Sequence, residues 1–153
     1  MAKRYWLFKS DPDAFGLPDL AVSPDQTTLW DGVRNYQARN LLRDEVQLND
    51  GVLFYHSQQK PPAVVATARV VRASYPDPTQ FDAKARYYDT KSQPANPRWF
   101  VVDIKLEKVF KREVTLPEMR EIPELADMVL LNNSRLSVQP VTAAEWRVIL
   151  RRG

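Results

Sequence analysis

Residues 99–110, WFVVDIKLEKVF, decide the fold class of this chain. Their second half alternates between apolar and charged side chains, which is the period of a β-strand with one buried face. A second run, AVVATARVV at 63–71, is also rich in β-branched residues, and Thr67 and Arg69 mark its wetter face. Both runs therefore predict long strands, and a sheet at the centre of the domain.

Shorter patterns flank these strands. Aromatic and β-branched residues predict further strands over 4–9, 52–56 and 136–141. Helices are expected over 16–22, 35–46 and 143–150 and after residue 115, with N-caps at Asn35, Thr115 and Thr142. Because strands outnumber helices and no regular βαβ repeat occurs, we expect an α+β fold. Its sheet should be curved and mostly antiparallel, forming a partial barrel flanked by short helices.

Length and composition fit one globular domain over residues 1–153, with 44% hydrophobic and 27% charged residues. The chain has no cysteine and a single histidine, His56, which excludes disulfides, cysteine nucleophiles and histidine-rich metal sites. We expect no metal and no cofactor. The net charge of +3 and the pI near 9.2 permit an anionic partner, although many basic proteins have none.

The N-terminal sequence MAKRYWLFKSDPD does not resemble a signal peptide, because Lys9, Asp11 and Asp13 interrupt a short apolar run. No stretch approaches the ~20 apolar residues of a membrane span. We therefore expect a cytoplasmic protein without a membrane partner, and favour a monomer.

The segment 30–40, WDGVRNYQARN, carries the first candidate site. Asp31 or Asn35 could bind the polar edge of a base, and the first helical turn could bind a phosphate, with charge added by Arg34 and Arg39. Alternatively, Trp30 anchors the core, and Asp31 and Asn35 are helix caps. Residue types alone favour this second interpretation.

Three other clusters have two interpretations each. His56 could be a general base or, as is more common, a hydrogen-bonded structural residue. Basic residues alternate with tyrosines and Trp99 in the proline-bounded segment 86–99, which suits either base stacking or packing of a surface loop. In the cluster 133–140, Arg135 and Ser137 could reach a cleft or simply close the sheet. The sequence contains no phosphate-binding loop, GxGxxG, HExxH or GxSxG motif, so an enzyme has no positive support.

From 5 to 150 the chain resembles the EVE domain family of the PUA-like superfamily. The matching runs are YWLFKSDP, WDGVRNYQARN, GVLFYHS, SYPDPTQFD, YYDTKS with NPRW, and RLSVQPVT with EW. The resemblance implies a fold related to YTH and ASCH domains, which bind a nucleotide at the mouth of a curved sheet. It also implies binding of modified bases, notably modified cytosine in DNA, with RNA also plausible. Asp11 and the 60–62 segment KPP depart from the family pattern.

The resemblance favours a non-catalytic pocket for a flipped base, with Trp30, Tyr55 and Trp99 approaching one another as its aromatic walls. The remaining base-binding candidates are polar or aromatic residues at element ends: Lys9, Ser10, Asp31, Asn35, Tyr36, His56, Ser57, Arg135 and Ser137. The candidates for phosphate contacts are Arg34, Arg39, Arg86, Lys91 and Arg98. We also expect loss of Trp30 to cost less stability than loss of Trp146, a predicted core residue.

Two alternatives stay open at this point. One is an enzyme of base or nucleotide chemistry that uses His56 or Asp31. The other is an adaptor that binds a peptide or a small metabolite in the same pocket.

Overall fold

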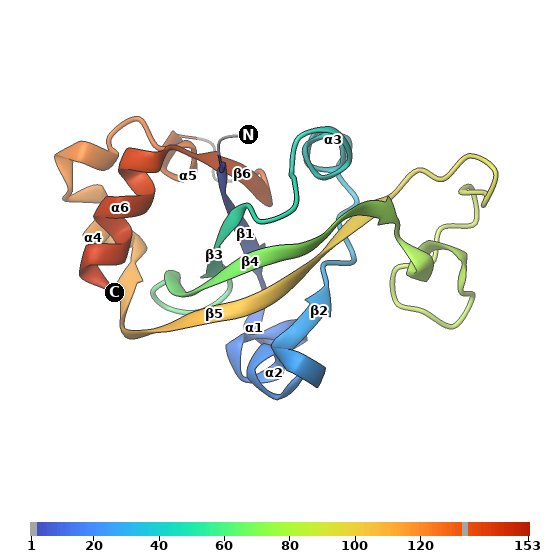
Figure 1. Cartoon of the computed structure of the whole chain (residues 1–153), viewed down its shortest axis with the longest axis horizontal. Helices are drawn as coiled ribbons and strands as arrows, with labels where there is room; N and C mark the ends of the chain where they lie inside the picture. The colour runs from blue at the N-terminus through green and yellow to red at the C-terminus, as the bar shows by residue number, and fades with distance from the viewer. Residues whose placement is uncertain (1–2, 133–134) are drawn as a thin grey trace.

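Two long antiparallel strands, β4 (Ala63–Pro76) and β5 (Phe100–Thr115), form the spine of the sheet in the computed structural model (Figure 1). The structure describes residues 3–132 and 135–153. Repeated register shifts interrupt the β4–β5 ladder, and such irregularities bend strands and increase their twist. The curved sheet predicted from the two long runs is therefore confirmed.

The remaining strands complete a six-stranded sheet in the order β2-β5-β4-β3-β1-β6. They are β1 (Tyr5–Ser10), β2 (Thr27–Leu29), β3 (Gly51–His56) and β6 (Val138–Val141). All neighbours are antiparallel except β1 and β3, which run parallel. The sheet is open, with β2 and β6 at its two edges.

Short helices lie around the sheet, some at its ends and one across a face (Figure 1). They are α1 (Pro12–Phe15), α2 (Leu17–Val22), α3 (Tyr36–Asp44), α4 (Leu116–Arg120), α5 (Val129–Asn132) and α6 (Ala143–Arg152). The three predicted N-caps are confirmed: each side-chain oxygen accepts a hydrogen bond from a backbone N–H of its helix, as Asn35 does from Ala38 at 3.0 Å. Three-residue or four-residue 3₁₀ turns lie at Pro24–Gln26, Pro78–Phe81 and Pro123–Leu125.

The sheet has an apolar cluster on each face. One contains Phe8, Trp30 and Phe54, and the other contains Tyr55 and Trp146. Strand alternation separates Phe54 from Tyr55, because successive side chains point to opposite faces. This division determines which predicted site residues can meet.

The loop between β4 and β5 extends away from the sheet (Figure 1, right). The Gln80 side chain, which is fully buried, fixes the base of this loop. Its amide donates to the carbonyls of Asp77 and Trp99, and its oxygen accepts from the Trp99 N–H and the Ser92 hydroxyl. The loop is thus held at both ends. Among the described residues no helix is long and apolar enough to cross a membrane.

Candidate nucleic-acid interface

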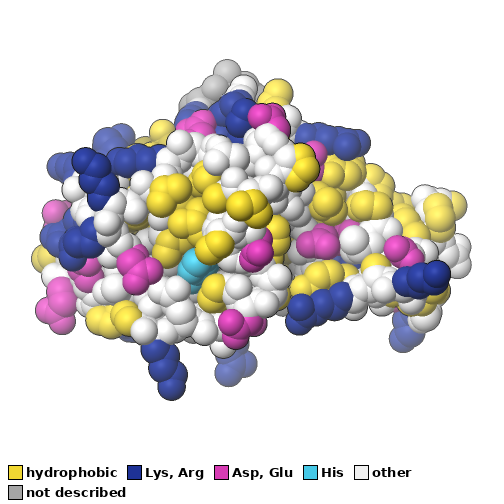
Figure 2. Space-filling model, turned by 90° about the horizontal axis from the view of Figure 1, so that it is seen from below, with side chains coloured by type: hydrophobic (Ala, Val, Ile, Leu, Met, Phe, Trp, Pro, Cys, Tyr) yellow, Lys and Arg dark blue, Asp and Glu magenta, His cyan; other side chains and the backbone are white. Residues whose placement is uncertain are grey.

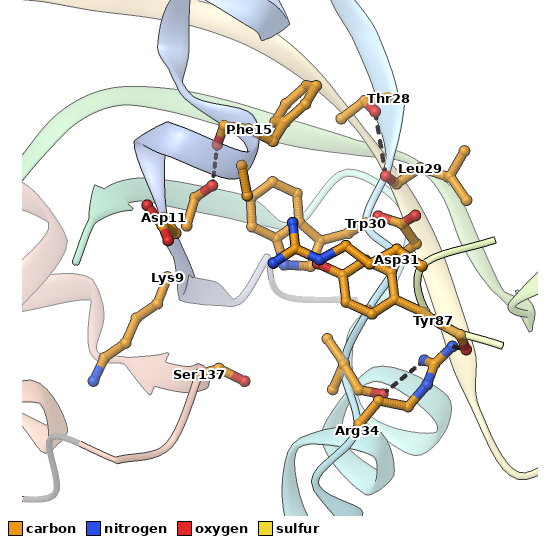
Figure 3. Close-up of a pocket in the computed structure, with 15 residues that line it drawn as sticks. Lys9, Asp11, Phe15, Thr28, Leu29, Trp30, Asp31, Arg34, Tyr87 and Ser137 are labelled. Atoms are coloured by element: carbon orange, nitrogen blue, oxygen red, sulfur yellow. Dashed lines mark hydrogen bonds between the residues drawn. The ribbon is translucent and has the colours of Figure 1, made fainter. Parts of the chain in front are cut away.

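A cavity of about 220 Å³ lies where the end of β1, the segment from β2 to α3 and the β4–β5 loop meet (Figure 3). Its walls combine aromatic and apolar side chains with charged and hydroxyl groups. The lining residues are Lys9, Ser10, Asp11, Ala14, Phe15, Thr28, Leu29, Trp30, Asp31, Gly32, Val33, Arg34, Arg86, Tyr87 and Ser137. Seven of the predicted site residues are among them: Lys9, Ser10, Trp30, Asp31, Arg34, Arg86 and Ser137.

Trp30 is both a core residue and a wall of this cavity. It is 7% exposed, and its ring packs against those of Phe8, Phe15 and Phe54 at centroid distances of 5.4, 6.5 and 5.5 Å. The backbone N–H of Trp30 donates to the Val102 carbonyl at 2.8 Å, which fixes the segment after β2 against β5. The two interpretations of Trp30 are therefore compatible, because one part of the side chain is in the core while another borders the cavity.

Two charged groups at the cavity have shifted pKa values. The pKa of Asp31 is raised, chiefly because the protein around it removes water from its carboxylate, and also because the negative charge of Asp77 is near. The pKa of Lys9 is lowered by the same loss of hydration. Asp31 is nonetheless exposed as a residue and Lys9 is half-buried, so both shifts reflect a partial loss of hydration at the cavity wall.

Arg34 fastens the β4–β5 loop to the cavity. Its guanidinium donates to the buried Asp77 carboxylate at 3.0 Å and to the Tyr87 carbonyl at 2.7 Å. Asp77 also accepts from the N–H and hydroxyl of Thr79, at 2.8 and 2.6 Å. The guanidinium is thus held in an internal ion pair, and the phosphate contact expected of Arg34 stays a prediction.

The predicted meeting of Trp30, Tyr55 and Trp99 is wrong. Tyr55 is on the opposite face of the sheet, in the Trp146 cluster, where burial raises its pKa to about 12. Trp99 is buried beside the cavity, stacked on Tyr36 with ring centroids 4.9 Å apart, and its indole N–H donates to Asp89 at 2.7 Å. Neither ring borders the cavity.

Asn35, His56 and Ser57 also lie outside the cavity. Asn35 is occupied as the α3 N-cap. His56 is 6% exposed; its Nε2 accepts from the Leu17 N–H at 3.0 Å and its Nδ1 lies 2.9 Å from the Gln59 amide oxygen. Ser57 donates to the Ser10 carbonyl. Each group therefore has a partner within the fold, and this geometry gives no support to the base-binding roles predicted for the three residues.

His56 borders a different, shallow groove with Leu17, Pro18, Val65 and Val109. Figure 2 shows the histidine among hydrophobic side chains on this face of the molecule. The general-base role proposed for His56 is therefore unsupported, because both ring nitrogens have partners and the ring is away from the cavity beside Trp30.

The other predicted cations lie around the cavity or beyond it. Arg86 is exposed at its rim, over the Tyr87 ring. Arg39 is over Tyr36, and Lys91 is exposed in the loop. Arg98 is partly buried, and Arg135 is exposed outside the cavity. Residues 133 and 134 of the last predicted cluster are outside the described residues.

Several lining residues were not predicted as site residues, including Phe15, Thr28, Leu29, Gly32 and Val33. Tyr87 belongs to an aromatic and basic run that could have identified it. Phe15 and Thr28 had no comparable signal, because only the folded chain brings α1 and β2 together. Among the described residues, no group of three histidines or carboxylates could hold a metal ion.

The family model described as "EVE domain" matches residues 4–152. The chain belongs to the EVE domain family. Among curated EVE relatives, thymocyte nuclear protein 1 of Danio rerio is 41% identical, with 95% of this chain and 70% of that protein covered. Thymocyte nuclear protein 1 of Homo sapiens is 39% identical, with 95% and 72% covered.

Solved structures share this EVE fold. A Leishmania major protein superposes with a TM-score of 0.93 at 44% identity, over 99% of this chain and 94% of that one. Human THYN1, solved in complex with 5-methylcytosine containing DNA, gives a TM-score of 0.93 at 38% identity, over 98% and 97%. A YTH domain of Zygosaccharomyces rouxii, at 15% identity and a TM-score of 0.56, shows a shared fold alone. The expected α+β architecture, a curved and mostly antiparallel sheet flanked by short helices, is confirmed.

Proposed function

We propose that the cavity beside Trp30 binds a nucleobase flipped out of DNA and favours 5-methylcytosine over cytosine. The observation that carries the proposal is the match of the whole fold to a structure bound to 5-methylcytosine DNA, together with a partly dry cavity at the sheet end. A flipped base offers two apolar faces and one polar edge. The cavity has groups for both, with rings from Trp30, Phe15 and Tyr87 and polar groups from Asp31 and Lys9.

Asp31 is the residue we assign to the base edge. An ionised carboxylate accepts a hydrogen bond from the exocyclic amino group of cytosine. The other lining carboxylate, Asp11, already caps α1 by accepting from the Asp13 N–H at 2.9 Å. The Ser10 hydroxyl donates to the Phe15 carbonyl. Asp31 therefore accounts best for selection of an amino group.

We further propose that the protein binds without catalysis. A nucleophile needs a base within hydrogen-bonding reach, and the only histidine lies elsewhere, with both nitrogens occupied. The expectations of a monomer and of a cytoplasmic location stay predictions. Because relatives are named thymocyte nuclear protein, a nuclear location is the alternative to test in cells.

The test is a titration with duplexes that differ at one position, carrying cytosine, 5-methylcytosine or thymine there. One buried methyl group is worth about 0.8 kcal/mol, so 5-methylcytosine should bind about fourfold more tightly than cytosine. Thymine keeps the methyl group but lacks the amino group, so it should bind more weakly than 5-methylcytosine. Equal affinity for all three duplexes would contradict the proposal, and parallel RNA strands test the nucleic-acid class.

A further inference from the structure

Six side chains form one continuous stack that leads from the cavity to the surface. Arg86 lies over the Tyr87 ring at 5.5 Å, and Arg34 lies between Tyr87 and Trp99, at 5.6 and 5.3 Å from their centroids. Trp99 stacks on Tyr36 at 4.9 Å with planes 25° apart, and Arg39 covers Tyr36 at 4.8 Å. All these cation–ring distances are within the range of favourable contact. The stack thus connects the cavity to the first turn of α3.

At the outer end of the stack, Tyr36 is exposed and Arg39 is half-buried. Tyr36 is 52% exposed, which is unusual for a large aromatic side chain at a helix start. The Arg39 guanidinium donates to the Arg98 carbonyl at 2.9 Å and to the Asn40 amide oxygen at 3.0 Å. Neither acceptor is a carboxylate, so the charge of Arg39 is not neutralised by these bonds. Among the described residues, no second ring packs on this guanidinium.

We infer that Arg39 at this end of the stack holds a base of the strand that flanks the flipped nucleotide. The inference rests on the proposed function, since the strand must enter the cavity at the other end of the stack. Guanidinium planes and aromatic rings are the surfaces on which single-stranded bases stack. A base on Arg39 would extend the existing stack by one layer, while the positive charge attracts the adjacent phosphate.

Arg39→Lys separates stacking from charge, because lysine keeps the cation and lacks the planar group. Arg151→Lys, on the exposed side of α6 at the other end of the sheet, is the matched control. Tyr36→Ala is the second variant, because it removes the ring beneath the guanidinium. Thermal melting of each variant checks that the fold is retained.

Affinity is measured for a series of duplexes that each carry one 5-methylcytosine and one abasic site. The abasic site is placed at each nearby position in turn, where it removes a flanking base but keeps the phosphate. With the parent protein, one abasic position should weaken binding about 5- to 150-fold, the range for one stacked base. Arg39→Lys and Tyr36→Ala should weaken binding to the intact duplex by a similar factor and lose the abasic effect. Both should keep the preference for 5-methylcytosine over cytosine, and Arg151→Lys should behave like the parent.

The two proposals fail in different ways. The stacking inference is overturned if no abasic position weakens binding to the parent protein, or if Arg39→Lys shows the full abasic effect. Either result counts whether or not the protein prefers 5-methylcytosine. A parent protein without methyl preference overturns the proposed function, although abasic sensitivity lost in Arg39→Lys would still support stacking. Absence of any binding to DNA overturns both.

Discussion

Gly32 and Tyr87 are in direct contact at the edge of the cavity: a Cβ atom added to Gly32 would lie 2.6 Å from the Tyr87 ring. Gly32 also has a φ of 81°, a conformation that residues with side chains rarely adopt. The glycine therefore serves two purposes. It allows the sharp turn after Trp30, and it lets the β4–β5 loop place a tyrosine against the segment that leads into α3.

Gly32→Ala should destabilise the protein by about 1–3 kcal/mol, from backbone strain and overpacking, and should displace Tyr87 from the cavity. Urea denaturation measures the loss. In a Tyr87→Ala background the same substitution should cost less, since only the backbone strain is left. Equal costs in both backgrounds would show that the ring does not limit this position.

The Asp77–Arg34 ion pair should attach the β4–β5 loop to the segment that leads into α3. Asp77→Ala removes a fully buried carboxylate and leaves the charge of Arg34, which is 23% exposed, without its partner, so it should cost up to about 3–5 kcal/mol of unfolding free energy. Glu45→Gln, in the exposed Arg4–Glu45 pair, is the control and should cost less than about 1 kcal/mol. Hydrogen exchange should also become faster over residues 78–98 in Asp77→Ala. Similar losses in the two variants would mean that the buried pair has no special role.

Sequence patterns predicted the long strands and the N-caps, because both depend on residues near one another in the chain. Strand β2 was missed, since three residues are too few to show a period. Tyr55 was expected at the pocket because it lies in a family-like run, but strand alternation places it on the face opposite Phe54 and His56. The role of Arg34 was missed because it depends on Asp77, 43 positions away, which only the folded chain brings within 3.0 Å.

The burial of Trp30 is a further property that residue types alone did not predict. The sequence predicted a smaller stability loss for Trp30→Ala than for Trp146→Ala, but the two side chains are 7% and 9% exposed. Both substitutions should therefore cost about 3–5 kcal/mol, because each leaves a large cavity. Trp30→Phe is the better test of function, since it keeps part of the packing while it changes the cavity wall. It should lower affinity for 5-methylcytosine DNA more than Trp146→Phe does, with both proteins checked by melting; equal affinities would remove Trp30 from the site.

Asp31 should limit stability and support binding at the same time. Its pKa is raised in the folded protein, so between the unfolded value near 3.8 and the folded value the folded state binds more protons. Its contribution to stability therefore falls as the pH rises through that window. Asp31→Asn removes this effect, so it should raise the melting temperature at pH 7 and give little gain at pH 3.

Asp89→Asn is the control of opposite sign. The pKa of Asp89 is lowered, first by the hydrogen bond from the Trp99 indole, so its stabilising effect is present at neutral pH and is lost as the pH falls. Asp89→Asn should therefore lower the melting temperature at pH 7.

In DNA binding, Asp31→Asn should reduce the preference for 5-methylcytosine over thymine, because an amide can pair with either edge. A carboxylate that costs stability but selects the ligand is typical of a functional residue. If Asp31→Asn is more stable and keeps the full preference, another group reads the base.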